Sequence, residues 1–303
     1  YIRIYFEILA AVQIAITEEA MHTDRKTKNE TLDYLQPIEI AEGVFWVGFA
    51  DTNLGLRCNP YLIVDGDEAV LIDGGSRGDF STVMMKILRT GVNPRMIKSL
   101  IYQHYDPDLC GNLPHLEAVI NNKDLKIISH KENNIFIHFY STASKKLCVE
   151  EMNFSYTFGN GRRLEFIMIP YAHCPGNFMT YDCKTKTLFS SDLFGSYDNI
   201  WELYLRDMDE CFNCNPQDEC HVRNRKCPIR GIISFHQRVM NSAASLRYAL
   251  DQVETKEIAL LAPQHGSLID SPDVRKLISR HLKSLEHVGF DYYMHRKMQG
   301  KVK

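Results

Sequence analysis

Short apolar runs separated by turn residues make up most of the chain from Ile38 onward. The stretches IEIAEGVFWVGF and PYLIVDGDEAVLIDGG each hold two such runs around a Glu-Gly or Asp-Gly pair, which predicts antiparallel strand pairs. Later runs alternate with stretches of helical spacing, such as FSTVMMKILRTG, which ends at a glycine suited to a helix C-terminus. The pattern therefore predicts an α/β domain in which strand pairs come first.

Several of the apolar runs lead into residues that can bind metals. MIKSLIYQH ends at His104, RRLEFIMIPYAH ends at His173, TLFSSD ends at Asp192 and EIALLAPQH ends at His265. We predict strands there, with helices over 232–254 and 272–288. This order of elements predicts two sheets packed back to back with helices outside, and it brings the strand ends to one rim.

The two ends of the chain differ from this central part. We divide the chain into an N-terminal helix and linker at 1–33, a domain at 34–290 and a C-terminal tail at 291–303. The apolar opening is interrupted by Arg3, Glu7 and Gln13, so we expect an amphipathic helix and no membrane span.

Composition narrows the possible partners and the compartment. The 303 residues have a formal net charge of -3, which gives no indication of nucleic-acid binding. The chain has nine cysteines and no recognisable secretory signal, which favours a reducing compartment, the cytoplasm.

Three histidines and three carboxylates make up the candidate metal site: His104, Asp106, Asp108, His173, Asp192 and His265. Each residue alone has an ordinary structural explanation, such as a packed histidine or a helix-capping aspartate. Together they could bind two metal ions if one carboxylate bridges. A set so rich in carboxylates is hard and anionic, which favours iron or manganese over zinc.

Four stretches resemble the diiron branch of the metallo-β-lactamase fold, the branch found in flavodiiron proteins. HYDPDLCGNLPHLE is similar to the H-x-E-x-D-H-x-G-x-L-P motif, and the other three are similar to the later ligand segments: YAHCPGNFMTYD, TLFSSDLFGSY and APQHGSLI. The resemblance implies an α/β fold of the metallo-β-lactamase-like αββα sandwich type. It also implies that His104, Asp106 and His173 hold one iron, that Asp108 and His265 hold another, and that Asp192 bridges them.

Two residues depart from the family motif. Asp106 stands where the family has glutamate, and Leu109 stands where the motif has its last histidine. The shorter Asp106 side chain could shift the first metal. Leu109 leaves a coordination position open, and it weakens the case for a hydrolase.

The resemblance is closest to stand-alone oxygen-binding diiron proteins, since no phosphate loop of a flavodoxin-like FMN domain follows the last predicted helix. Our leading hypothesis is an O2-binding sensor that signals to a partner protein. The alternatives are an O2, NO or peroxide reductase fed by a separate flavoprotein, and a dinuclear metallohydrolase. By the same resemblance we expect a homodimer.

A cysteine-rich insert at 210–230 has the spacing C-x2-C-x5-C-x6-C, formed by Cys211, Cys214, Cys220 and Cys227. A zinc or iron site with four thiolates, a redox disulfide pair and a loop of unbonded thiols all remain open. Cys110 and Cys174 lie beside predicted ligands, where we expect them to be packing residues.

Overall fold

The computed structural model describes residues 32–49, 57–140, 143–197, 201–206, 208–215 and 227–301. The predicted N-terminal helix and linker therefore lie outside the described residues, apart from the last two linker positions. Within the described ranges, no helix has the length and apolar character needed to cross a bilayer.

The first sheet has seven strands in sequence order. Its first four strands pair antiparallel, and its last four pair parallel, so β4 belongs to both parts. The strands are β1 (Ile38–Ala41), β2 (Val44–Trp46), β3 (Tyr61–Asp65), β4 (Glu68–Ile72), β5 (Ile97–Ile101), β6 (Lys126–Ser129) and β7 (Lys145–Cys148).

The second sheet has five strands in the order β12-β11-β10-β9-β8. All its pairs are antiparallel except that of β11 with β12. The strands are β8 (Ser155–Thr157), β9 (Arg163–Met168), β10 (Phe178–Asp182), β11 (Thr187–Phe189) and β12 (Leu260–Ala262).

Alternation along the strands forms the cores on both faces of each sheet. In β3, Tyr61 and Ile63 face the core between the sheets, whereas Leu62 packs toward the outer helices. In β10, Phe178 lies in the same inner core and Met179 lies on the outer face of the second sheet. This period of two is the reason that both sheets are covered on both faces.

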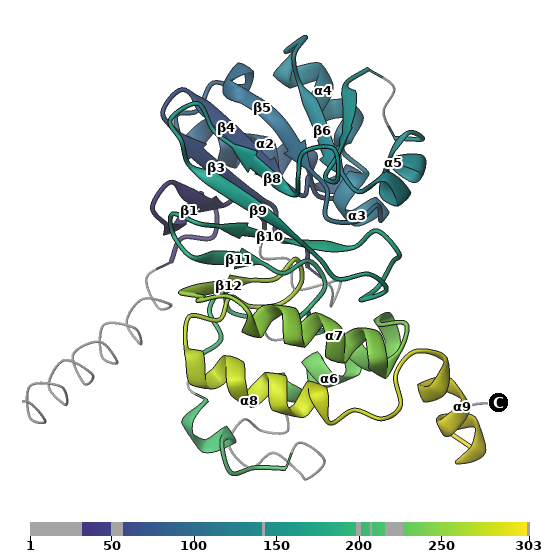
Figure 1. Ribbon diagram of the computed structural model, residues 1–303. Coiled ribbons are helices and arrows are strands. Elements are labelled where there is room, and N and C mark those ends of the chain that lie inside the picture. The colour runs from purple at the N-terminus through teal and green to yellow at the C-terminus, as the bar shows by residue number, and fades with distance from the viewer. Residues whose placement is uncertain are drawn as a thin grey trace, which may run out of the picture.

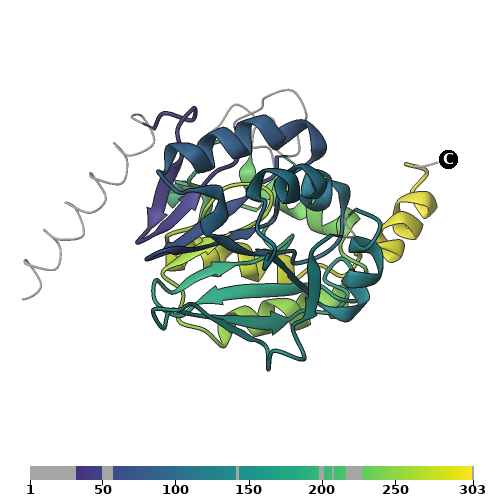
Figure 2. The ribbon, with the colours of Figure 1, turned by 90° about the horizontal axis from the view of Figure 1, so that it is seen from above.

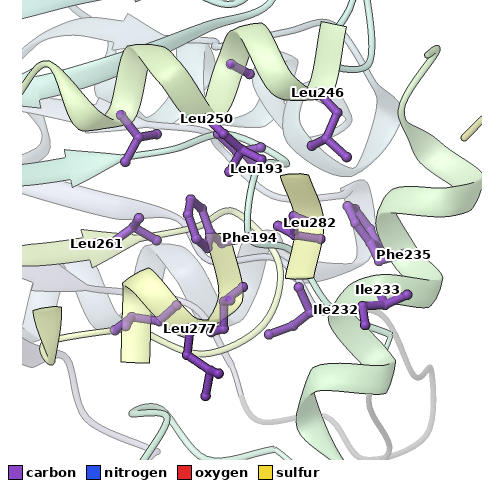
Figure 3. Packing of buried hydrophobic residues seen from close by; sticks show 14 of the residues in the cluster. Leu193, Phe194, Ile232, Ile233, Phe235, Leu246, Leu250, Leu261, Leu277 and Leu282 are labelled. Carbon is purple, nitrogen blue, oxygen red and sulfur yellow. The ribbon is translucent and has the colours of Figure 1, made fainter. Parts of the chain in front are cut away.

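Helices cover the two outer faces (Figures 1 and 2). The first sheet packs against α2 (Phe80–Arg89), α3 (Pro107–Cys110), α4 (Leu113–Ile120) and α5 (Lys131–Ile137). The second sheet packs against α6 (Pro228–Val239), α7 (Ala243–Glu254) and α8 (Pro272–Lys283), whose leucine, isoleucine and phenylalanine side chains interlock as Figure 3 shows. The predicted αββα sandwich is confirmed.

Two sequence predictions about individual elements are wrong. The single helix predicted over 232–254 is two helices, α6 and α7, because the hydroxyl of Ser242 accepts a hydrogen bond from the Ser245 amide and starts a new helix. The strand predicted to reach His173 ends at Met168. The helix α9 (Phe290–Met298) begins at the last residue of the predicted domain and runs into the range 291–303 that we set apart as a tail.

Candidate metal centre

Strand order brings distant parts of the sequence to one edge of the sandwich. β3 runs antiparallel to β4, and β4 runs parallel to β5, so the start of β3 lies beside the ends of β4 and β5. His104 follows the end of β5. In the second sheet, the parallel neighbours β11 and β12 lead to Asp192 and His265.

Each of the three predicted histidine ligands has its Nδ1 atom near an oxygen acceptor. The acceptor is Ser191 Oγ at 3.1 Å for His104, the Val239 carbonyl at 3.4 Å for His173, and the Arg57 carbonyl at 2.7 Å for His265. A carbonyl can only accept, so the proton sits on Nδ1 of His173 and His265. Ser191 donates its own proton to Asn177 Oδ1 at 2.8 Å, so it accepts from His104.

This arrangement leaves Nε2 of every histidine facing a carboxylate. His173 Nε2 lies 2.9 Å from Asp106 Oδ2, and His265 Nε2 lies 3.2 Å from Asp108 Oδ2. His104 Nε2 lies 3.9 Å from Asp106 Oδ2. Metal-binding histidines are held in this way, with one nitrogen bonded to an outer acceptor and the other free to coordinate.

Asp192 lies between the two groups of ligands. Its Oδ1 atom is 3.8 Å from His104 Nε2 and 3.5 Å from His265 Nε2. This buried oxygen has no hydrogen-bond partner among the described residues. Two ligands at about 2.1 Å from one metal are separated by about 3.0 Å at a right angle and about 4.2 Å when opposite, so these spacings fit atoms that share a cation. The donor set therefore fits a pair of metal ions.

The sequence did not point to Cys58, which the structure places beside the predicted ligands. Cys58 Sγ lies 3.3 Å from Asp108 Oδ2 and 3.9 Å from His265 Nδ1. Among the described residues, two sets of side chains each have their potential ligand atoms within 4.8 Å of one another. One set is His104 with His173 and Asp192, and the other is Cys58 with Asp108 and His265.

We call His104, Asp106 and His173 the first half-site, and Cys58, Asp108 and His265 the second half-site. The only sequence signal for Cys58 is that a cysteine and an asparagine come directly before a buried strand, in CNPYLIVD.

The charges in the two half-sites compensate one another. Burial opposes protonation of His173, but the hydrogen bond that its Nε2–H donates to Asp106 and the nearby charge of Asp192 outweigh burial and raise the pKa of His173 to about 9. Burial also opposes ionisation of Asp108, yet His265 lowers the pKa of that carboxyl below its usual range. Burial raises the pKa of the Cys58 thiol to about 12. Without a metal, the carboxylates thus share protons with imidazoles at the positions where a cation would sit.

A layer of polar side chains holds the ligands in place. Asn59 donates to the carbonyls of Pro263 and Gly266, at 3.0 and 2.9 Å, and so fixes the His265 segment against the start of β3. His173 and Ser191 have positive φ angles of 111° and 55°. Such backbone strain costs about 1–3 kcal/mol per residue and is concentrated at functional sites.

Neighbouring residues of the motif face away from this centre. Leu109 is fully buried in the hydrophobic cluster between the first sheet and its helices. Cys110 lies in the same cluster, and the Cys174 thiol donates to Asn133 Oδ1 at 3.5 Å.

The cysteine-rich insert is only partly described. Cys211 and Cys227 are buried in the hydrophobic cluster of the second sheet, and Cys214 is exposed. Cys220 lies outside the described residues. Neither of the two ligand sets found in the described part of the chain includes an insert cysteine, so a zinc ion there has no structural support.

Comparison with curated proteins identifies relatives that are longer than the matched region. The chain is 26% identical over 243 residues to an uncharacterized protein, MJ0732, of Methanocaldococcus jannaschii, covering 77% of this chain and 56% of that protein. It is 26% identical over 174 residues to a nitric oxide reductase of Moorella thermoacetica, covering 54% of this chain and 43% of that protein. The match therefore spans about half the length of each relative.

A solved structure described as the peroxy diiron species of the chemotaxis sensor ODP matches almost throughout. It superposes with a TM-score of 0.66 and 22% identity, covering 86% of this chain and 97% of that one. This likeness confirms the metallo-β-lactamase-like fold. Residues 56–266, more than half of the chain, match the family described as ODP family beta lactamase. The chain therefore belongs to the ODP family of beta-lactamase-fold domains.

Proposed function

We propose that this chain binds O2 at a diiron centre and serves as an oxygen sensor. In this proposal His104, Asp106 and His173 hold one iron, Asp108 and His265 hold the other, and Asp192 bridges the two. The observation that carries it is the orientation of the three histidines, each with Nδ1 bonded to an oxygen acceptor and Nε2 facing the carboxylates. A hydrolytic or structural site does not require iron, whereas this carboxylate-rich ligand set favours iron over zinc.

Exposure indicates the side from which a small ligand can approach. The Asp106, Asp108 and His173 side chains are 35%, 27% and 25% exposed, whereas those of His104, Asp192 and His265 are 1–4% exposed. Solvent therefore reaches the centre past these three side chains, two of which belong to the first half-site. When bound, two ferrous ions supply the electrons and open coordination positions that O2 requires. The protein's own residues orient the ligands and exclude water from the other sides.

The similarity to the structure of the chemotaxis sensor supports a sensor, since it covers 86% of this chain and 97% of that one. A sensor of this kind needs a signalling partner, and we extend the proposal to a homodimer in the cytoplasm. A thiolate zinc site or redox pair at Cys211, Cys214, Cys220 and Cys227 remains part of the hypothesis.

The proposal is tested by loading the chain with Fe(II) under anaerobic conditions and titrating it with O2. We expect a visible absorption change that saturates at about one O2 per two irons, with no continued O2 consumption when an external flavoprotein reductase and NADH are added. Absence of any optical change in a protein that holds two irons would refute O2 binding.

The second candidate function is a reductase that receives electrons from a separate flavoprotein. It is favoured by the similarity to a nitric oxide reductase, and it uses the same ligands. Rapid and sustained consumption of O2 or NO in the presence of the external reductase would establish it in place of the sensor.

A further inference from the structure

The two half-sites hold unequal numbers of metal ligands if only the sequence-predicted residues are counted. The first iron would have His104, Asp106 and His173 together with the bridging Asp192. The second would have Asp108 and His265 with the same bridge. Leu109 cannot supply the missing ligand, because its side chain has no donor atom and is buried in the hydrophobic cluster between the first sheet and its helices.

Cys58 is placed to fill this gap. Its sulfur lies 3.3 Å from Asp108 Oδ2, and that same oxygen lies 3.2 Å from His265 Nε2. A thiolate at about 2.3 Å and a carboxylate oxygen at about 2.1 Å from one metal are about 3.1–3.8 Å apart for bond angles between 90° and 120°. In the metal-free chain the Cys58 thiol donates to Asp108 at 3.3 Å, and this separation lies within the range for two ligands of one metal.

The surroundings of Cys58 distinguish it from the chain's packing cysteines. Cys58 belongs to none of the three hydrophobic clusters of the described chain, whereas Cys110, Cys211 and Cys227 each belong to one. Cys174 also belongs to none, but its thiol donates to Asn133 and not to a candidate ligand. The polar neighbours of Cys58 are the Asp108 carboxylate, which faces the candidate centre, and the outer nitrogen Nδ1 of His265. The thiol is almost completely buried, so solvent cannot satisfy it.

We propose that Cys58 is a thiolate ligand of the second metal, so that the second half-site is a Cys/Asp/His site bridged to the first by Asp192. The inference rests on the proposed dinuclear centre and adds a ligand to it. Metal binding displaces the thiol proton, and thiolate, a soft donor, also makes this half-site accept Zn(II) or Co(II) more readily than the first. The two half-sites would then differ in metal preference.

X-ray absorption at the cobalt edge of the whole chain, loaded anaerobically with Co(II), tests this assignment. We expect two metals per chain and a sulfur scatterer at about 2.3 Å from the metal, with a thiolate charge-transfer band in the near ultraviolet. Two bound metals without a sulfur scatterer, or uptake of one metal only, would overturn the inference. This result comes from the unmodified protein, so it does not depend on whether a variant folds.

Variants then assign the sulfur to one residue. Cys58→Ser and Cys58→Ala should lose the sulfur scatterer and bind the second Co(II) at least tenfold more weakly. Cys174→Ser is the matched control, because Cys174 is also a buried thiol near the centre but donates to Asn133 and not to a ligand. Retention of the sulfur scatterer in both Cys58 variants, or its loss in the control, would contradict the assignment.

The same samples separate this inference from the proposed function. A chain that shows the sulfur scatterer but, when loaded with iron, gives no optical response to O2 would remove the oxygen-binding function and leave Cys58 as a ligand. A chain that responds to O2 but shows no sulfur scatterer would support the oxygen-binding function and remove Cys58 as a ligand.

Discussion

The two half-sites are built from different kinds of structure. In the first, His173 lies in a turn with a φ of 111°, and its Nδ1 is 3.4 Å from the Val239 carbonyl. In the second, His265 is separated from the end of β12 by Pro263 and Gln264, and its Nδ1 is 2.7 Å from the Arg57 carbonyl. Each half-site reaches solvent through a carboxylate, with the side chains of Asp106 and Asp108 35% and 27% exposed, but only the first also exposes its histidine. His173 is 25% exposed and held by the longer hydrogen bond, whereas His265 is 4% exposed and more closely held. We infer that the first half-site admits the ligand and the second anchors the centre.

Replacement of Asp192 should have the largest effect, because it removes the residue common to both half-sites. We expect Asp192→Ala to lose most of both metals, as measured by mass spectrometry after gel filtration of anaerobically loaded protein. Asp73→Asn is a suitable control, since Asp73 is a buried carboxyl at the same edge of the sheet but outside both ligand sets. A variant of Asp192 that retains two tightly bound metals would show that the half-sites do not depend on a bridge.

Replacement of one histidine at a time should separate the half-sites. His265→Ala should lose the second metal and also weaken the first, because the anchoring half-site is gone. His173→Ala should lose the first metal and leave the second tightly bound. Isothermal titration with Co(II) measures both affinities. Equal losses in the two variants would contradict the difference that we infer.

Removal of the Ser191 hydroxyl should weaken only the first half-site. Ser191→Ala takes away the acceptor for His104 Nδ1, and loss of such an outer partner lowers metal affinity by about 10–100-fold. Ser190→Ala is the matched control, because the Ser190 hydroxyl donates to the Leu193 carbonyl and does not contact a ligand. If both serine variants bind the metals equally well, the hydroxyl does not position His104.

The smallest expected effect concerns the segment that carries Asp192. His236 accepts a hydrogen bond from the Phe194 amide at 3.0 Å, and burial lowers its pKa from 6.5 to about 4. The unfolded chain therefore takes up this proton at a higher pH than the folded chain, so stability is present above about pH 6.5 and is lost as the pH falls toward about 4. The loss between pH 7 and pH 5 should be about 2 kcal/mol.

Urea denaturation of the metal-free protein measures this pH dependence. His236→Gln should remove the contribution, so the variant's free energy of unfolding should fall less between pH 7 and pH 5 than that of the wild type. His138→Gln replaces an exposed histidine and should leave the dependence unchanged. A wild-type slope preserved in His236→Gln would contradict the linkage.

The sequence predicts much of the fold because alternating apolar runs and turn residues report burial directly. It also predicts where five of the proposed ligands lie, because Asp106, Asp108, His104, Asp192 and His265 follow strands that end at one edge. His173 is different, since its strand stops at Met168 and a strained turn places the imidazole. No local pattern predicts that turn, which depends on packing against α6.

The sequence could not predict that Cys58 lies beside the candidate metal centre. It lies 50 positions from Asp108 and 207 from His265, and only the antiparallel start of β3 brings it to the ligands. The sequence also does not show the break between α6 and α7, although this break depends on residues that are close together in the sequence. The apolar period continues across Ser242, and only the capping hydrogen bond shows where one helix ends and the next begins.

The most direct test of the central claim is native mass spectrometry of the chain after anaerobic loading with Fe(II), recorded for the wild type and for Asp192→Ala. The account predicts two irons per wild-type chain, bound with little of the one-iron form, and loss of both together in the variant. A wild-type chain that binds a single iron, or that takes up two zinc ions in preference to iron, would contradict a diiron centre at His104, Asp106, Asp108, His173, Asp192 and His265.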